Sequence, residues 1–261
     1  MKKVLALLFA LLMLLNITAC SNGETEKSGK DREDKETVTL YLIKTMEIKV
    51  ENGPENFPGV VEFVYEEGWQ EKDSFTIRAD LTVNDLTQTL LQTASDKKLV
   101  QQTIVDGDEM QKTETVYDEN GRAIKQTIYL KAGMTDKVES TRTYDKKGRL
   151  VKEVSKTYFS DGTAPIEVTQ TFTFQETAEG SKAVNDTGMV TQLYNEKNQL
   201  IEQTTLINGE ESSRIVYTYN EYGKQQTVTT YIQGALSHSM TYTYTPVEVS
   251  KEKAEQLPWF Q

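Results

Sequence analysis

The sequence has few of the residues that build metal sites and disulfides: its 261 residues include one cysteine, one histidine and five prolines. One cysteine excludes an internal disulfide, a redox dithiol and a cysteine-based zinc site, and one histidine excludes a multi-histidine metal cluster. Basic residues are also scarce, because 29 Lys and Arg stand against 40 Asp and Glu, for a net charge of −11. This sign is wrong for a general nucleic-acid binder. We therefore expect no metal, no cofactor and no nucleic-acid partner.

The longest hydrophobic run lies at the N-terminus and is short. Residues 4–15 are all apolar and follow the basic start Met1-Lys2-Lys3. As a helix this run measures about 18 Å, well below the roughly 30 Å of a bilayer core, so it predicts the hydrophobic region of a signal peptide rather than a permanent span.

The segment ends in Ile17-Thr18-Ala19-Cys20, which resembles the lipobox of bacterial lipoproteins. The resemblance implies that residues 1–19 are a signal peptide and that Cys20 is acylated on sulfur and becomes the new N-terminus. Acyl chains there would anchor the protein to the extracytoplasmic face of the cell membrane. The alternative is an ordinary secretory leader cleaved near Thr18. The sole cysteine at this one position favours the lipobox. Whether the envelope has one membrane or two stays open.

The next stretch, residues 20–36, predicts a solvated tether. Positions 21–36 hold ten charges and no large apolar side chain, so they cannot build a core. Residues 37–261 are then left for one large domain with a short C-terminal cap.

Alternation of apolar and polar residues predicts β-strands through almost all of this domain. Polar residues, most of them Thr, alternate with Ile166, Val168, Phe172 and Phe174 in one segment and with Met240, Tyr242 and Tyr244 in another. Asn52-Gly53, Asp106-Gly107, Asp161-Gly162 and Asn208-Gly209 accept the positive φ of tight hairpin turns. We expect an all-β antiparallel meander, and we assign Leu86, Leu90 and Leu91 to a strand pair rather than a helix.

A repeated unit underlies the meander. Its turn appears four times, and the residues that define it are Tyr117, Asp118 and Gly121; Tyr144, Asp145 and Gly148; Tyr194 and Asn195; and Tyr219, Asn220 and Gly223. Asp or Asn is expected to cap the turn, Gly to take its left-handed position, and Tyr to supply apolar area with a hydroxyl left in water. These roles are structural.

The first two copies, Tyr117-Asp-x-x-Gly-Arg and Tyr144-Asp-x-x-Gly-Arg-Leu, resemble the YD repeat of Rhs-type and wall-associated bacterial surface proteins. The later copies depart from it by Asn for Asp and, in the third, by Asn198 for Gly. The resemblance covers roughly residues 90–245. It implies β-sheet architecture and an extracytoplasmic setting, and nothing about catalysis.

The sequence offers few candidate catalytic or metal-binding residues. Ser95-x-x-Lys98 matches a motif of acylating serines, but the repeat places it on a hairpin turn. Asp106-Gly107-Asp108 and residues 118–121 offer oxygen ligands for calcium, yet neither continues into a twelve-residue loop closed by Glu. His238 lies just before the last predicted strand, which Pro246 ends, and nothing in the sequence assigns it a nucleophile. We expect the recurring Thr and Gln on exposed strand faces.

The C-terminus and the strand count shape the fold. Ser250 is expected to cap a short helical turn, and Trp259 and Phe260 to dock over the open edge of the sheet, with a partner or the membrane as alternatives. About a dozen or more strands in one meander must curl, since open sheets rarely exceed about ten. We expect a barrel-like sheet, open or closed.

Two binding functions follow. We favour a non-enzymatic protein that binds an envelope or extracellular partner through Tyr and Thr faces. The alternative is a carrier or chaperone that holds a lipid or other amphiphile within the curved sheet, with Phe172, Phe174, Tyr242 and Tyr244 as its apolar ligand face. An enzyme comes third, because no catalytic constellation stands out.

Overall fold

The computed structural model describes residues 37–51, 59–83, 86–131, 133 and 135–260. The predicted signal peptide, Cys20, the tether and the Asn52-Gly53 turn lie outside these residues.

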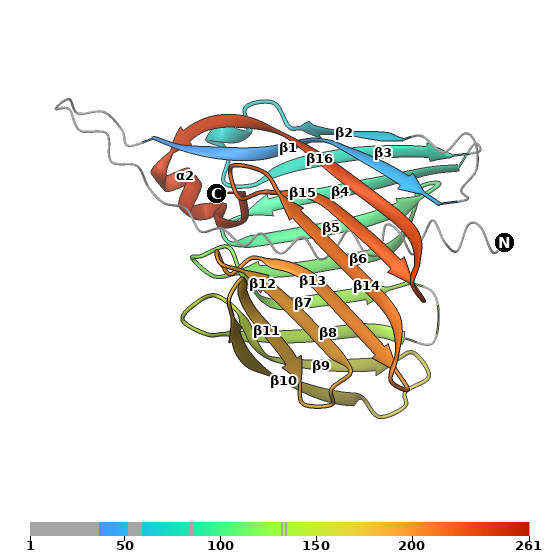
Figure 1. The fold of residues 1–261 in the computed structure, drawn as a ribbon. Coiled ribbons are helices and arrows are strands. Elements are labelled where there is room, and N and C mark those ends of the chain that lie inside the picture. The colour runs from blue at the N-terminus through green and yellow to red at the C-terminus, as the bar shows by residue number, and fades with distance from the viewer. Residues whose placement is uncertain (1–36, 52–58, 84–85, 132, 134, 261) are drawn as a thin grey trace.

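The chain folds into a single closed barrel of sixteen antiparallel strands in sequence order, which confirms the all-β meander and selects the closed form (Figure 1). The strands are β1 (Thr37–Val50), β2 (Val60–Tyr65), β3 (Phe75–Val83), β4 (Leu86–Ser95), β5 (Lys98–Val105), β6 (Asp108–Tyr117), β7 (Ala123–Leu130), β8 (Thr135–Tyr144), β9 (Leu150–Phe159), β10 (Ile166–Thr177), β11 (Gly180–Asn185), β12 (Val190–Asn195), β13 (Leu200–Ile207), β14 (Glu210–Tyr219), β15 (Gln225–Ile232) and β16 (Ala235–Ser250). In the described residues, three short helical segments accompany them, namely η2 (Trp69–Glu71), α2 (Lys251–Gln256) and η3 (Pro258–Phe260).

The first and last strands close the barrel. β1 pairs with β16 in a register that runs from Thr37 opposite Ser250 to Val50 opposite His238. Pro246 does not end β16, contrary to the sequence-based prediction. The pairing of β16 with β15 stops at Thr241, so beyond that point β16 has a strand on one side only, and a missing N–H can face the unpaired side.

The outer wall of the barrel is polar. Side chains two apart on one strand share a face, and on the outer face such neighbours form ion pairs: Arg78 with Asp80, Lys112 with Glu114, and Lys137 with Glu139. A lipid-facing wall would instead need an apolar band, so this wall is suited to water. None of the helices in the described ranges has the length and apolar character needed to cross a membrane.

The predicted exposure of glutamine is wrong. Gln88, Gln92, Gln101, Gln111, Gln126 and Gln192 are all buried, and they occupy inward-facing rows of their strands. The alternation was identified correctly, but closure decides which of the two rows faces inward. A wide barrel has more interior surface than its apolar side chains cover, so amides fill part of it and bond to neighbours, as Gln111 does to Thr113.

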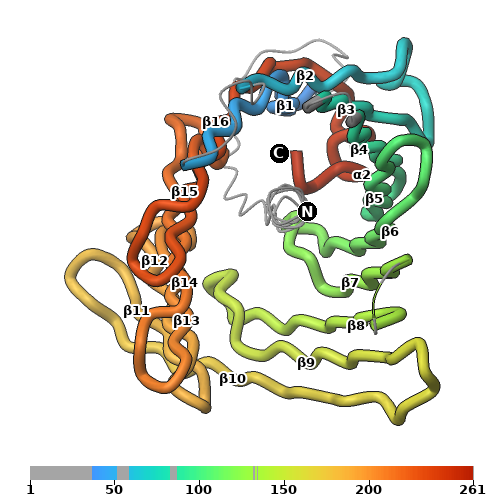
Figure 2. Tube along the Cα trace, turned by 90° about the vertical axis from the view of Figure 1, so that its right-hand side faces the viewer, coloured from blue at the N-terminus to red at the C-terminus, as the bar shows by residue number. Residues whose placement is uncertain are grey.

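The C-terminal segment fills one side of the barrel interior. The Ser250 Oγ accepts the Lys253 N–H and caps α2, as predicted. Trp259 and Phe260 are buried, but not over a sheet edge, because the closed barrel has none. They lie inside it, in a core cluster with Leu40, Phe75 and Leu99, and the Trp259 ring stacks on Tyr117 with centroids 4.7 Å apart. Figure 2 shows the C-terminal end within the ring made by β1–β6.

The barrel therefore has two unlike halves. We call β1–β7 the filled half, because its interior holds the C-terminal plug (residues 251–260) and most of a second cluster around Met46, Ala79 and Leu90, which Val228, Met240 and Tyr242 extend onto β15 and β16. We call β8–β16 the hollow half. Within β8–β14 the buried apolar cluster is small, made of Phe172, Ala183 and Tyr194.

Candidate functional site

The four repeat turns have one geometry. In each, the side-chain oxygen of Asp118, Asp145, Asn195 or Asn220 accepts the backbone N–H groups two and four residues later. The left-handed position holds Gly121 (φ 72°), Gly148 (φ 84°), Asn198 (φ 58°) and Gly223 (φ 73°). Asn198 replaces Gly because Asn tolerates this conformation better than other side chains. The motif thus positions strands rather than a ligand.

The repeat tyrosines do not leave their hydroxyls in water. Tyr144 donates to the Ala123 carbonyl and Tyr219 to that of Leu200, and Tyr244, which continues the series 25 residues after Tyr219, donates to that of Gln225. Each bond connects one repeat to the return strand of the preceding hairpin. In these three tyrosines the hydroxyl therefore links two hairpins, whereas the Tyr194 hydroxyl donates to Gln192 on its own strand.

The residue after the left-handed position matches the charge of the Asp or Asn that caps the same turn. Arg122 and Arg149 form ion pairs with Asp118 and Asp145 in the first two copies. In the third copy, Asn195 donates to Gln199, which is neutral.

The fourth copy breaks this match. It combines the neutral Asn220 with Lys224, which is buried, and no carboxylate of the described residues pairs with its ammonium. Burial lowers the pKa of Lys224 to about 8.

A cavity of about 390 Å³ opens in the hollow half. Its walls come from β8–β10 on one side and β12–β16 on the other. This volume suits a small-molecule ligand. The C-terminal plug does not line it, so the cavity lies beside the plug rather than beneath it.

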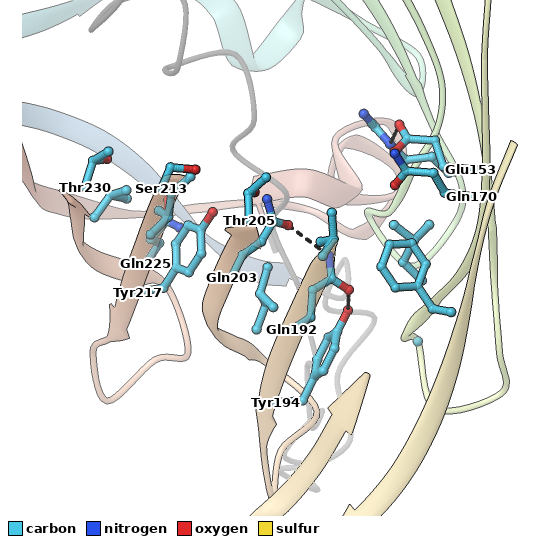
Figure 3. A pocket seen from close by; sticks show the side chains of 18 of the residues that line it. Glu153, Gln170, Gln192, Tyr194, Gln203, Thr205, Ser213, Tyr217, Gln225 and Thr230 are labelled. Atoms are coloured by element: carbon cyan, nitrogen blue, oxygen red, sulfur yellow. Dashed lines mark hydrogen bonds and ion pairs between the residues drawn. The ribbon is translucent and has the colours of Figure 1, made fainter. Parts of the chain in front are cut away.

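Polar side chains line the middle of the cavity and face one another across it (Figure 3). On one wall Arg142 donates to Glu153 at 2.9 Å. On the opposite wall Tyr194 donates to the Gln192 amide oxygen at 2.8 Å, and the Gln192 amide nitrogen donates to Gln203 at 2.9 Å. We call Arg142, Glu153, Gln170, Gln192 and Gln203 the polar belt.

Aromatic and aliphatic groups line the rest. Phe172, Tyr217, Met240 and Tyr242 contribute apolar surface. Burial raises the pKa of Tyr217 to about 12 and that of Tyr242 further, so both hydroxyls stay neutral at physiological pH. The lining is therefore amphipathic, with carbon surface beside hydrogen-bonding groups.

Apolar side chains continue the cavity rows toward the end of the barrel away from α2. Val168, Ile207 and Ile232 lie two residues beyond the cavity residues Gln170, Thr205 and Thr230 and so share their inward face. They are about half exposed, at 49%, 57% and 51%. With Ile166, also 55% exposed on β10, they form what we call the mouth rim.

The four residues predicted as an apolar ligand face divide into two groups. Phe172 and Tyr242 line the cavity from β10 and β16. Phe174 packs on Tyr194, with centroids 5.8 Å apart and the Arg149 guanidinium over its ring, and Tyr244 contributes the backbone link described above. The polar belt was not predicted from the sequence. The signal that could have indicated it is a pair of opposite charges at facing positions of β8 and β9, where Arg142 pairs in register with Glu153.

Other candidates are accounted for by the fold. Ser95 ends β4 at a hairpin turn, as predicted. His238 is buried, its pKa is lowered by burial, and its Nδ1 lies 3.2 Å from Ser237 Oγ. Asp108 forms an ion pair with Lys131. The described residues contain no group of three or more His, Cys, Asp or Glu side chains placed to hold a metal ion.

No family model matches the sequence, and no curated protein sequence matches it. Among solved structures, the chain is similar to a porin-like protein from Bacteroides uniformis, at 12% identity and a TM-score of 0.37, over 78% of this chain and 98% of that one.

Proposed function

We propose that this protein is a non-enzymatic, membrane-anchored binding protein that carries a small amphiphile in the hollow half of its barrel, on the extracytoplasmic side. The observation that supports the proposal most directly is the 390 Å³ cavity with its amphipathic lining. An interior filled only for stability would be closely packed, and in the filled half Leu40 and Phe75 are 0% and 1% exposed. A space of this size beside aromatic and amide side chains is typical of a ligand site.

The other binding hypothesis, contact through an exposed Tyr and Thr surface, has less support. Tyr117, Tyr194 and Tyr242 are buried and cannot contribute to such an interface, which leaves tyrosines such as Tyr129 and Tyr222, at 41% and 54% exposed, as its aromatic contacts. The outer wall instead carries ion pairs and threonines, which are typical of a solvated sheet face.

The topology is consistent with an anchor at Cys20. β1 begins at Thr37 opposite Ser250, where α2 also begins, so a tether would join the barrel at its plugged end. The mouth rim lies at the other end. In the proposed arrangement the mouth points away from the anchoring membrane and is accessible to ligand.

Native mass spectrometry of the full chain, extracted from membranes, tests this function. We expect a protein mass that includes acyl chains at Cys20 and a second, non-covalent mass that is lost on activation. Thr205→Trp places an indole in the cavity and should abolish the second mass. Thr204→Trp, one residue away and outside the cavity lining, should retain it. No bound mass in the wild type, or equal retention in both variants, would refute the carrier function.

A further inference from the structure

The cavity carries no net charge. Of its lining residues only Arg142 and Glu153 are ionised, and they pair with each other at 2.9 Å. The Arg142 side chain also donates to Gln126, so both charges are held within the protein. A ligand with an ionic group in this site would bury a charge with no counter-charge, which is costly.

The same lining offers hydrogen bonds in both directions. Amides donate and accept, and Gln170, Gln192 and Gln203 approach from two facing walls. The hydroxyls of Thr205, Ser213 and Thr230 add to them. A head group with several hydroxyls or amides can satisfy such a site, whereas a plain hydrocarbon would leave these groups unpaired.

The mouth rim extends the cavity with apolar surface that has no protein partner among the described residues. Ile166 and Val168 on β10, Ile207 on β13 and Ile232 on β15 lie at one end of the barrel, the end whose turns also carry Asp106, Asp161 and Asp186. Apolar rim and acidic turns together favour an alkyl chain and disfavour an anionic head group at the entrance.

From these observations we infer that the ligand is an uncharged amphiphile with a polyhydroxyl or amide head group, held with its head at the polar belt and its alkyl chain along the mouth rim. This inference rests on the proposed carrier function and specifies its ligand class. A glycoside of a fatty alcohol has the required chemistry. A fatty acid, an anionic phospholipid and a cationic amphiphile do not.

Four probes with the same octyl chain test the inference on the full chain: octyl glucoside, octyl sulfate, octyltrimethylammonium and octanol, each below its micelle concentration. Affinity is measured by calorimetry after removal of any co-purified mass. We expect octyl glucoside to bind at least about tenfold more tightly than either charged probe, because charge burial is uncompensated. A charged probe that binds as tightly as the glucoside would overturn the inference.

Two variants sharpen the assignment of the head-group site. Thr205→Val conserves shape and removes one hydroxyl, so octyl glucoside should lose roughly threefold to tenfold in affinity while octanol is unchanged. Glu153→Gln leaves Arg142 without its counter-charge and should shift preference toward octyl sulfate. Glu139→Gln, on the outer face of β8, is the matched control and should change neither affinity.

The outcomes separate the inference from the function it rests on. If none of the four probes binds, the carrier function itself fails. If octanol and the charged probes bind as well as the glucoside, and Glu153→Gln changes nothing, the carrier function stands and the head-group assignment is wrong. Thermal unfolding of each variant checks that the barrel is intact. If Glu153→Gln does not fold, Thr205→Val alone tests the head-group assignment.

Discussion

The filled and hollow halves of this barrel are built from the same kind of hairpin, yet only one of them is packed. In the filled half, inward rows such as Phe75, Ile77 and Ala79 on β3 meet the C-terminal plug or one another. In the hollow half, inward rows mix Gln, Thr and Tyr around a cavity. The difference shows that a regular meander determines the wall of the barrel, whereas the packing of the interior depends on which segments and side chains enter it. One half then supplies stability and leaves the other free to bind.

The largest expected effect comes from removing the same side chain in each half. Phe75 is 1% exposed and packs on Trp69, whereas Phe172 is 8% exposed and lies beside the cavity. Phe75→Ala should reduce the free energy of unfolding by about 4 kcal/mol and Phe172→Ala by about half as much, because a side chain at an existing void has fewer neighbours to lose. Urea denaturation measures both, and equal losses would contradict the division into halves.

A second comparison uses two glycines of the repeat turn. A Cβ at Gly121 would lie 2.6 Å from the Pro258 carbonyl oxygen in the plug, whereas at Gly148 the nearest atoms are 3.9 Å away on the Arg122 side chain. Both have positive φ, which costs about 1 kcal/mol for Ala. Gly121→Ala should cost about 2 kcal/mol more than Gly148→Ala, since the plug must also shift. The midpoints of thermal unfolding would test this, and similar shifts would mean that the plug yields easily.

The third comparison sets the Asp–Arg turns against Asn220 and Lys224. The pKa of Lys224 is lowered to about 8 in the folded protein, compared with about 10.4 in the unfolded chain. Below pH 8 both states are protonated, and the cost of the buried charge is fully present. Between about pH 8 and 10.4 the unfolded chain binds more protons than the folded one, so the free energy of unfolding from this group rises with pH.

Asn220→Asp restores the pairing found at Asp118 and Asp145. We expect it to stabilise the protein by about 1–2 kcal/mol at pH 7 and to remove the rise above pH 8, because the folded-state pKa of Lys224 returns toward its usual value. Denaturation at pH 7, 8.5 and 9.5 measures both effects. A stabilisation with an unchanged pH slope would assign the gain to the turn rather than to Lys224.

The smallest effect concerns Asn198, which takes the position that Gly holds in the other three copies, at φ 58°. Asn198→Gly relieves the left-handed conformation but adds freedom to the unfolded chain. The two terms nearly cancel, and we expect a change within about 0.5 kcal/mol. A loss above about 1 kcal/mol would indicate that the Asn198 side chain makes a contact of its own.

Local features of the sequence predicted the wall of the barrel well. The Asx-Gly turns and the period of two predicted the hairpins around Gly107, Gly162 and Gly209, and the repeat correctly assigned Leu86, Leu90 and Leu91 to a strand. These features are local because a turn is built from four or five neighbouring residues. The prediction that Pro246 ends its strand was wrong because it depended on a non-local feature. A strand tolerates proline where no second strand needs its N–H, and that depends on which strand lies beside it.

The binding site was less predictable. Phe172 and Tyr242 could be named from their alternation, but their place in one cavity depends on strands 70 residues apart in sequence and on the barrel's closure through β1 and β16. The polar belt was missed because a glutamine in an alternating strand is expected on the solvent side. Only the excess interior of a wide barrel makes buried amides favourable, since facing side chains supply their hydrogen bonds.

By itself, then, the sequence determined the turns, the strands and their order, because these arise from φ preferences and side-chain alternation within a few residues. The tertiary structure alone decided which row of each strand faces inward, where the C-terminal plug lies and which half stays hollow. Those choices depend on contacts between residues far apart in the chain, and they exist only once β1 has paired with β16 and divided an inside from an outside.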